Sequence, residues 1–331
     1  KTLRCKKLTV SIQPDKSGTF SVTDIKAAGR VWLHYAEFTA MGNHLQWQNV
    51  TQTCHLTGED ATVSTQNFTL SGSDLTFFRM NNRFQAKGSG DLIWTGTNGA
   101  QKGESEGNGG LLEAGGSGKT EINWTKSMTF DKSEHWAIFK GQVSAKQVQT
   151  SLSGEVLELQ FAEDNTRVKK GSARGGAKLV KSRGEEGDIA FTCEQMQWVP
   201  GEATLRLTSG EKEKVHVRTP HQELAADEVI FNQNTGMLRC PAPGTMTVAG
   251  NTDGQADGPP PVSVQWHQSM QYNRSSPAHA LFKGGVEASM NGRMVRWDRL
   301  GVRFNKQMEP TEIVESGQAQ LVSGGDQSAN E

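Results

Sequence analysis

The sequence has no uninterrupted run of 18 apolar residues, so it predicts no helix that spans a membrane. It also lacks a leader with a charged start, an apolar middle and a small-residue end, so we expect any signal or anchor to lie outside this chain. The charges almost cancel, with 35 Lys and Arg against 36 Asp and Glu. No net field would attract nucleic acid, and we expect no nucleic-acid partner.

Apolar residues are scarce, at 34% of the chain, whereas 37 residues are glycine. A chain of 331 residues has room for two or more domains. Because many turns accompany little apolar material, the composition predicts a thin, extended core rather than a deep spherical one.

Patterns that carry catalysis or metal binding are also missing. The cysteines at 5, 54, 193 and 240 lack metal-ligand spacing, so we interpret them as apolar core residues rather than as disulfides or site residues. The eight histidines contain no pair at metal spacing, and no carboxylate pair or Gly-x-Ser-x-Gly elbow stands out. The GGSGKT run at 115–120 has Glu113 where a phosphate loop needs glycine. We therefore expect no catalytic residue, no cofactor, no metal and no enzyme activity.

What the chain does have is an internal repeat, which must be recognised before any local feature is interpreted. Residues 262–304 repeat the pattern of residues 122–161, with one inserted residue in a turn. A second pair of segments, 43–63 and 194–217, is followed in both copies by a third pair, 73–90 and 227–244. The order of the segments is the same in both copies, which indicates a duplicated unit rather than a chance similarity.

The repeats predict how the chain is organised. We expect residues 1–40 to end one repeat and start the next, and residues 305–331 to start a further repeat and end in a polar tail. Two full units are expected at 41–161, with a Gly-rich loop at 95–120, and at 188–304, with a loop at 249–261. A basic, Gly-rich loop is expected between them at 162–187.

Within each unit, apolar residues alternate with polar ones. Ile122 and Trp124 share a parity, as do Leu157, Leu159 and Phe161, and no stretch keeps a helical period for long. Alternation of this kind is typical of strands with one buried face. Asn-rich and Gly-rich turns separate the strands, so the sequence predicts an all-β fold of stacked antiparallel strands.

Two motifs in these repeats carry a family likeness. The first runs from Ala226 to Cys240 and has the form Ala-Asp, apolar-x-aromatic, Asn-x-x-Thr-Gly, then apolar-x-small. The second is Phe-x-Gly-x-Val, which stands at 139–143 and at 282–286. In both, the chain resembles the OstA-like superfamily, which includes the lipopolysaccharide-transport proteins LptA and LptC and the N-terminal domain of LptD. Together the two signatures cover most of the chain outside the three loops.

The resemblance implies an extended, open β-jellyroll, similar to a solenoid, whose inner face carries lipid acyl chains and whose copies join end to end. It implies a periplasmic or cell-envelope location in a double-membrane bacterium, and lipopolysaccharide or another acylated lipid as partner. Head-to-tail self-association, or association with other β-jellyroll proteins of this kind, is a further expectation. The family has no catalytic residue to carry over. The chain has long insertions that the family's shorter bridge proteins lack.

Residues of one parity are the candidates for the lining of a lipid groove, because a strand stack that opens along one side presents its inner face as an apolar strip. The candidates are Leu45, Trp47, Leu75, Phe77, Trp124, Met128, Phe130, Phe139, Val143, Met196, Trp198, Val229, Phe231, Trp266, Met270, Tyr272, Phe282 and Val286. The alternative is a structural β-repeat scaffold, with the inner face filled by its own side chains and partners docked on sheet edges. A weaker candidate for contact with an anionic ligand is the basic group Lys169, Lys170 and Arg174.

Overall fold

The computed structural model of the chain describes residues 2–14, 18–95, 119–165, 167–184, 187–211, 213–248, 261–274, 278–290, 293–305, 310–316 and 319–322. The chain divides into two units, Lys1–Gly175 and Gly176–Glu331. Most of the described residues lie in β-strands, and the pairings between them are antiparallel. The all-β fold of stacked antiparallel strands is therefore confirmed. The repeat boundaries expected at 41–161 and 188–304 stay a prediction.

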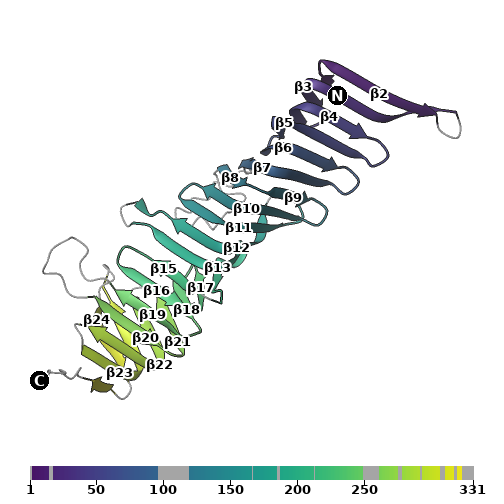
Figure 1. Cartoon of the computed structure of the whole chain (residues 1–331). Helices are drawn as coiled ribbons and strands as arrows, with labels where there is room; N and C mark the ends of the chain where they lie inside the picture. The colour runs from purple at the N-terminus through teal and green to yellow at the C-terminus, as the bar shows by residue number, and fades with distance from the viewer. Residues whose placement is uncertain are drawn as a thin grey trace, which may run out of the picture. The chain divides into compact units, whose positions relative to one another are not determined.

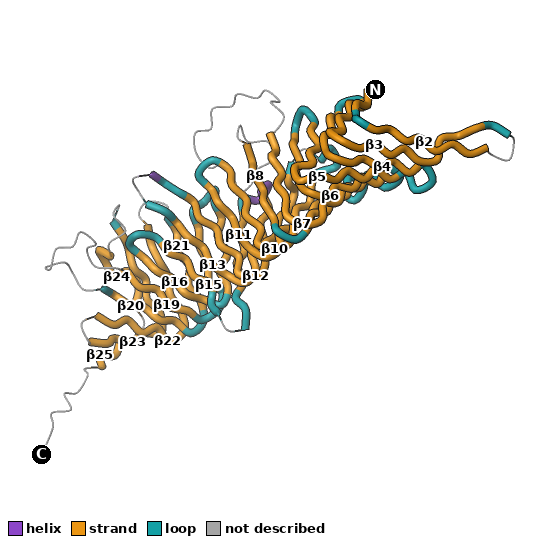
Figure 2. Tube along the Cα trace, turned by 45° about the horizontal axis from the view of Figure 1, so that its top comes forward, coloured by secondary structure: helices purple, strands orange, loops and turns teal. Residues whose placement is uncertain are grey.

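In unit 1, most strands are hydrogen-bonded to the strand that precedes or follows them in the sequence (Figures 1 and 2). Its strands are β1 (Thr2–Arg4), β2 (Lys7–Pro14), β3 (Phe20–Tyr35), β4 (Phe38–Gln48), β5 (Thr53–Ser64), β6 (Phe68–Phe78), β7 (Arg83–Thr95), β8 (Lys119–Trp124), β9 (Ser127–Asp131), β10 (Trp136–Gln147) and β11 (Thr150–Phe161). Strand β12 (Val168–Lys181) contains the boundary between the units.

Unit 2 repeats the plan with shorter strands. They are β13 (Ile189–Val199), β14 (Thr204–Thr208), β15 (Val215–Arg218), β16 (Gln222–Ala226), β17 (Glu228–Asn232), β18 (Met237–Cys240), β19 (Gly244–Val248), β20 (Val262–Trp266), β21 (Ser269–Asn273), β22 (Ala278–Met290), β23 (Arg293–Phe304), β24 (Pro310–Ser316) and β25 (Ala319–Val322). The 3-10 turn η2, Pro200–Glu202, precedes β14.

The long strands bend at a bulge near their middle. In β10 the register with β11 shifts between Lys140 and Val143, and the two residues between them, Gly141 and Gln142, both have positive φ. Strand β22 has the same shift between Lys283 and Val286, again around two residues with positive φ. Gly141 and Gly284 are the glycines of the Phe-x-Gly-x-Val signature, and a Cβ there would collide with Lys126 and Gln268. The signature therefore marks the bend of the strand.

The bends divide each unit into two layers of strand segments. On one side of the bend, β10 pairs with β9, and on the other side it pairs with β8. Layer A of unit 1 contains residues 24–28, 44–48, 53–57, 74–78, 83–87, 127–131, 136–140 and 156–160. Layer B contains residues 31–35, 38–42, 61–64, 68–72, 90–95, 119–124, 143–147 and 150–154.

Apolar side chains form two parallel rows across layer A of unit 1. The deep row, next to the bend, is Ala27, Leu45, Leu56, Leu75, Ala86, Met128, Phe139 and Leu157, and all of them are buried. The shallow row, two residues farther from the bend, begins with Ile25, Trp47, Cys54, Phe77, Phe84 and Phe130, which are half-buried, and ends with Ala137 and Leu159, which are buried. Their alternation with outward polar residues is the period of two that the sequence shows.

Unit 2 has the same two rows in its corresponding layer. Its deep row contains Met196, Leu207 and Val229 in one paired series, and Cys240, Met270, Phe282 and Leu300 in another. Its shallow row is Trp198, Leu205, Phe231, Leu238, Tyr272, Ala280 and Val302. Met128 and Met270, which the repeat aligns, therefore take the same place in the two units.

One loop prediction is wrong. Within the segment 162–187, Val168–Lys181 forms strand β12, in which Ala173, Ala177 and Leu179 are buried. Small inward residues and outward lysines produce a weak hydrophobic signal, although the alternation itself is that of a strand. Of the loops predicted at 95–120 and 249–261, only the ends lie in the described ranges, and the tail at 323–331 lies outside them.

The cysteines are all free thiols. Cys193 and Cys240 are buried among apolar residues, as the sequence predicts, whereas Cys5 and Cys54 are half-buried. Burial raises the pKa of the Cys193 thiol to about 12, with a further contribution from the nearby Glu194 carboxylate. Burial also raises the pKa of Cys240 to about 12, and that of Cys54 to about 11. Thiols with such pKa values stay protonated and unreactive at neutral pH.

Candidate apolar groove

The groove candidates all lie on the inner face of the bent strands, but at two depths. Thirteen of the eighteen are buried: Leu45, Leu75, Trp124, Met128, Phe139, Val143, Met196, Trp198, Val229, Trp266, Met270, Phe282 and Val286. These side chains contact other parts of the chain in this structure. The remaining five, Trp47, Phe77, Phe130, Phe231 and Tyr272, are half-buried and all belong to the shallow rows. Among the candidates, only these five therefore present apolar surface to a ligand.

Two buried tryptophans of the repeat form hydrogen bonds to the backbone near the bend. Trp124 is 2% exposed and donates a hydrogen bond from Nε1 to the carbonyl oxygen of Gly88, 3.1 Å away. Trp266, which the repeat aligns with it, is 0% exposed and donates to the carbonyl oxygen of Ala242 at 2.9 Å. Each indole also covers the glycine paired with it on the neighbouring strand, Gly90 or Gly244. Their positions are those of wall residues that hold the two layers together.

Phe84 is the centre of an aromatic cluster that joins the layers of unit 1. Its ring centroid lies 4.5 Å from that of Phe77 and 6.5 Å from that of Phe130, both of which belong to the shallow row. It also lies 6.3 Å from Phe38 and 6.4 Å from Phe68, which come from layer B. Contacts at these distances stabilise the approach of the layers. The space between the layers is therefore partly filled by the chain's own rings at this level.

The cluster continues toward the end of unit 1. Trp94 in layer B lies 5.4 Å from Phe161, and Phe161 lies 5.7 Å from Phe130. In unit 2, Phe191 and Phe231 approach to 6.1 Å. At the other end of unit 1, by contrast, Leu8, Val10 and Ile12 of β2 are 53%, 46% and 59% exposed. The apolar inner face is thus most accessible over the first strands of unit 1.

Sequence reasoning missed Phe84, Phe38 and Phe68. Phe84 shares the parity of Ala86 and aligns with Leu238 in the second copy, so the repeat contained a signal for its inward direction. Phe38 and Phe68 begin their strands, and their contacts with Phe84 join residues far apart in sequence. Nothing in the repeat pattern predicts which rings meet across the two layers.

The basic candidates lie on β12. Lys169, Lys170 and Arg174 are exposed, and Arg174 forms an ion pair with Glu158 at 2.7 Å. An exposed pair of this kind leaves less charge for an external anion. Contact of these three residues with an anionic ligand stays a prediction.

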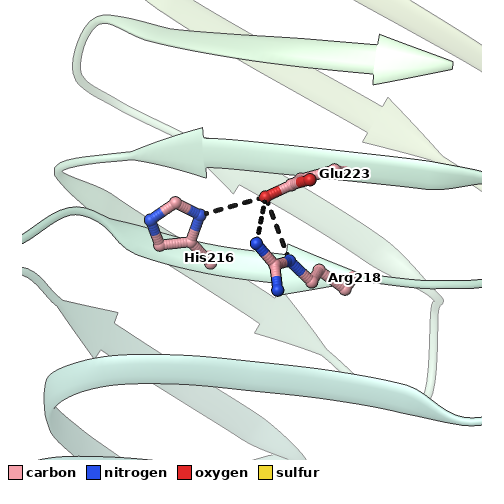
Figure 3. A network of polar contacts seen from close by, with 3 residues as sticks. All are labelled: His216, Arg218 and Glu223. Carbon is pink, nitrogen blue, oxygen red and sulfur yellow. Dashed lines mark hydrogen bonds and ion pairs between the residues drawn. The ribbon is translucent and has the colours of Figure 1, made fainter.

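A polar network occupies the outer face of β15 and β16 in unit 2 (Figure 3). Arg218 donates to Glu223 Oε1 from Nε at 3.0 Å and from Nη2 at 2.8 Å, and His216 Nδ1 lies 3.4 Å from the same oxygen. The hydrogen bond from Arg218 lowers the pKa of Glu223, and His216 contributes in the same direction. All three side chains are solvent-accessible, so the network fixes the outer surface rather than the groove.

Neither membrane helices nor metal sites were found in the described ranges. Among these residues, no helix has the length and hydropathy that crossing a bilayer requires. In the same part of the chain, no three His, Cys, Asp or Glu side chains gather closely enough to hold a metal ion.

Comparison with known proteins gives a likeness to solved structures. No family model matches the chain, and no curated protein matches it. Among solved structures, the chain is similar to the crystal structure of LptH, the LptA-homologous periplasmic component of the conserved lipopolysaccharide transport device from Pseudomonas aeruginosa. The identity is 12%, the match covers 41% of this chain and 85% of that chain, and the TM-score is 0.32. The fold class stated above rests on the strand pairing itself.

Proposed function

We propose that this chain is a non-enzymatic, OstA-like protein of the cell envelope that binds or conveys lipopolysaccharide or another acylated lipid, in support of outer-membrane assembly. The proposal places the lipid on the shallow rows and the location in the periplasm. It rests on the two OstA-like signatures in the sequence and on the apolar inner face, and the lipid partner follows from that resemblance.

The observation that carries the proposal is the unbroken shallow row of unit 1. From Val10 on β2, the row continues through Ile25, Trp47, Cys54, Phe77, Phe84 and Phe130, with each residue paired to the next across neighbouring strands. Neighbouring strands lie about 4.8 Å apart, so the row is roughly 30 Å long. Each of these seven residues is apolar and at least partly accessible. An acyl chain can lie along such a strip.

The energetics of a half-buried acyl chain are sufficient for binding. Each methylene that leaves water contributes about 0.8 kcal/mol, so even partial burial of a chain of about twelve carbons is worth several kcal/mol. The deep row behind the strip is buried, so the strip has a rigid apolar support. Affinity would therefore come from accessible rings and not from the thirteen buried candidates.

The proposal is tested by photocrosslinking from two adjacent positions of one strand that face opposite sides of the sheet. Phe77 lies in the shallow row, whereas its neighbour Thr76 points outward and pairs with His55 and Gln85. A benzophenone amino acid at position 77 is expected to crosslink to a radiolabelled acylated glycolipid, and the same amino acid at position 76 is not. Phe77→Asp should abolish binding of the glycolipid, with Thr76→Asp as the folded control. Equal crosslinking at both positions would refute the groove.

The scaffold function is the second candidate, and the Phe84 cluster is the observation that favours it. Rings that already fill the space between the layers leave less room for an acyl chain. The two functions differ in one measurable property, since a lipid carrier purified without detergent should retain lipid that native mass spectrometry detects. Phe84→Ala separates them further: it should increase lipid uptake by a carrier, whereas in a scaffold it should only lower stability.

A further inference from the structure

The outer face of unit 1, opposite the apolar rows, contains a depression of about 390 Å³ over strands β2 to β5. Its polar lining consists of Lys7, Thr9, Lys26, His44, Gln46, His55 and Thr57, and Ala27, Ala28 and Leu45 complete the lining. The strand alternation directs these side chains outward, because the intervening Ala27 and Leu45 are buried in the deep row. The depression therefore lies on the other side of the sheet from the lipid strip, and its function is independent of the proposed lipid binding.

A small residue creates the depression. Ala28 lies between Lys7 and His44 in one cross-strand row, since it pairs with Lys7 on one side and with His44 on the other. Its methyl group leaves a gap between its two direct neighbours in this row, Lys7 and His44, whose side chains are longer. The gap is bordered on a third side by Lys26 and Gln46. Lys26 lies two residues before Ala28 on the same strand, and Gln46 pairs with Lys26. The floor is therefore a methyl group, and the rim consists of hydrogen-bond donors.

The rim has an excess of positive charge. Lys26 lies 3.6 Å from Asp24, which also accepts a hydrogen bond from Gln46, and His55 Nε2 lies 2.7 Å from Asp74. These two carboxylates are therefore engaged. Lys7 and His44, in contrast, form no ion pair or side-chain hydrogen bond within the described ranges. Two donors, one of them a permanent cation, face each other across Ala28 without a partner.

We propose that this depression, the Ala28 pocket, binds a phosphate monoester or inorganic phosphate. An ammonium group, an imidazole, a hydroxyl and an amide around a small floor suit a tetrahedral oxyanion, for which lysine acts as a point charge. A planar carboxylate is recognised best by the fork of an arginine, and no arginine lines the pocket. The groups nearest the anion are Lys7 on β2 and His44 on β4, with Thr9, Lys26 and Gln46 around them.

The expected affinity is modest, because the rim is open to solvent. Exposed charge pairs contribute less than about 1 kcal/mol each, so removing one cation should weaken binding by about threefold to fivefold. Salt should weaken binding as well, since exposed charges are screened within about 10 Å at 0.1 M ionic strength.

The experiment is a titration of the folded protein with inorganic phosphate in phosphate-free buffer, followed through the histidine side-chain signals in NMR spectra. Saturable shifts of His44 and His55 are expected. Lys7→Gln and His44→Gln should each weaken binding about threefold to fivefold. Ala28→Leu should abolish binding without changing any charge, because it fills the floor. Lys87→Gln is the matched control: Lys87 pairs with Asp74 in the same outer row and lies outside the pocket.

A second arm identifies the source of the phosphate group. Phosphatidylcholine vesicles that contain a phosphorylated glycolipid are compared with vesicles that contain its dephosphorylated form, and bound protein is measured by flotation. If the pocket accepts a lipid-borne phosphate, only the first vesicles bind protein and Ala28→Leu reduces this binding. If it accepts free phosphate alone, the NMR titration saturates and flotation is equal for both vesicles. The proposal is overturned if phosphate gives no saturable shift, or if Lys87→Gln weakens binding as much as Lys7→Gln.

Discussion

Trp266 donates a hydrogen bond from its buried indole nitrogen to the carbonyl oxygen of Ala242, 2.9 Å away. Trp198, in the same unit and also buried, has no acceptor for its Nε1 among the residues that the structure describes. A comparison of Trp266 with Trp198 therefore separates the energy of the hydrogen bond from the energy of burying an indole. The bond from Trp124 to Gly88 in unit 1 corresponds to the bond of Trp266.

Trp266→Phe is expected to destabilise the protein by about 0.5–1.5 kcal/mol more than Trp198→Phe, because it removes a hydrogen bond to Ala242 for which Trp198 has no equivalent among the described residues. Both changes remove a similar volume from the core, so the cavity contribution is similar in the two variants. Urea unfolding followed by circular dichroism measures the difference. Equal losses in the two variants would show that the bond to Ala242 contributes nothing.

Gly244→Ala should destabilise unit 2 by about 1–3 kcal/mol, because the new methyl group would overpack the bend. A Cβ at this position would lie 2.5 Å from Trp266 Cζ2 and 2.7 Å from the carbonyl oxygen of Ala225. Gly201→Ala is the control, since a Cβ there would meet no atom within 4 Å. It should leave stability unchanged or raise it by less than about 1 kcal/mol. Thermal unfolding of both variants decides the matter, and a stable Gly244→Ala protein would contradict the indole's role.

Cys193 and Cys240 should resist alkylation in the folded protein. Burial raises the pKa of both thiols to about 12, so almost no thiolate is present at pH 8. Iodoacetamide at pH 8 should modify them only after unfolding in urea, and peptide mass spectrometry locates the adducts. The half-buried Cys5 provides the comparison within the same sample. Fast modification of Cys193 or Cys240 without urea would refute the buried environment.

The same thiols make stability depend on pH in the alkaline range. An unfolded cysteine loses its proton at about pH 8.5, whereas these two keep theirs until about pH 12 in the folded state. Their contribution is therefore complete below about pH 8.5 and is lost as pH rises toward 12. In a Cys193→Ala, Cys240→Ala protein the decline in unfolding free energy over this range should be shallower than in the original chain.

Arg218→Gln should raise the pKa of Glu223 toward the ordinary value of a glutamate. The hydrogen bond from Arg218 is the main cause of the lowered pKa, and His216 adds to it. Carbon-13 NMR of the Glu223 carboxyl measures the change directly. A lowered pKa means that the stabilising contribution is present above the pKa of the unfolded glutamate and is lost as pH falls. Because the side chain is 46% exposed, the effect on stability is small.

The sequence predicts the strand class and the inner face because Trp124, Met128 and Phe139 recur as Trp266, Met270 and Phe282 at the same parity. Since a strand alternates its faces, parity alone assigns each side chain to a side of the sheet. The strand β12 was missed because its inward residues include Ala173 and Ala177, whose small side chains give little hydrophobic signal.

The sequence does not predict how deeply each inward side chain is buried. Phe77 and Leu75 share a strand and a parity, yet one is half-buried and the other is 4% exposed. The difference depends on the distance of each from the bend, and the bend lies at the register shift of that strand between Gly72 and Asp74. Contacts such as that of Phe84 with Phe38 join residues that no local pattern relates. Whether the groove is open or filled is therefore a tertiary property.

The bulge at Gly141 and Gln142 has a consequence for how such chains can change in length. The bend of β10 is produced by two residues of that strand, and the same device is built again at Gly284 and Gly285 of β22. A hairpin that includes its own bulge could thus be gained or lost without altering the geometry of strands elsewhere. Stability would then grow by one nearest-neighbour increment for each added hairpin, as in a one-dimensional array. The number of strands in the stack becomes an evolutionary variable that is separate from the chemistry of its inner face.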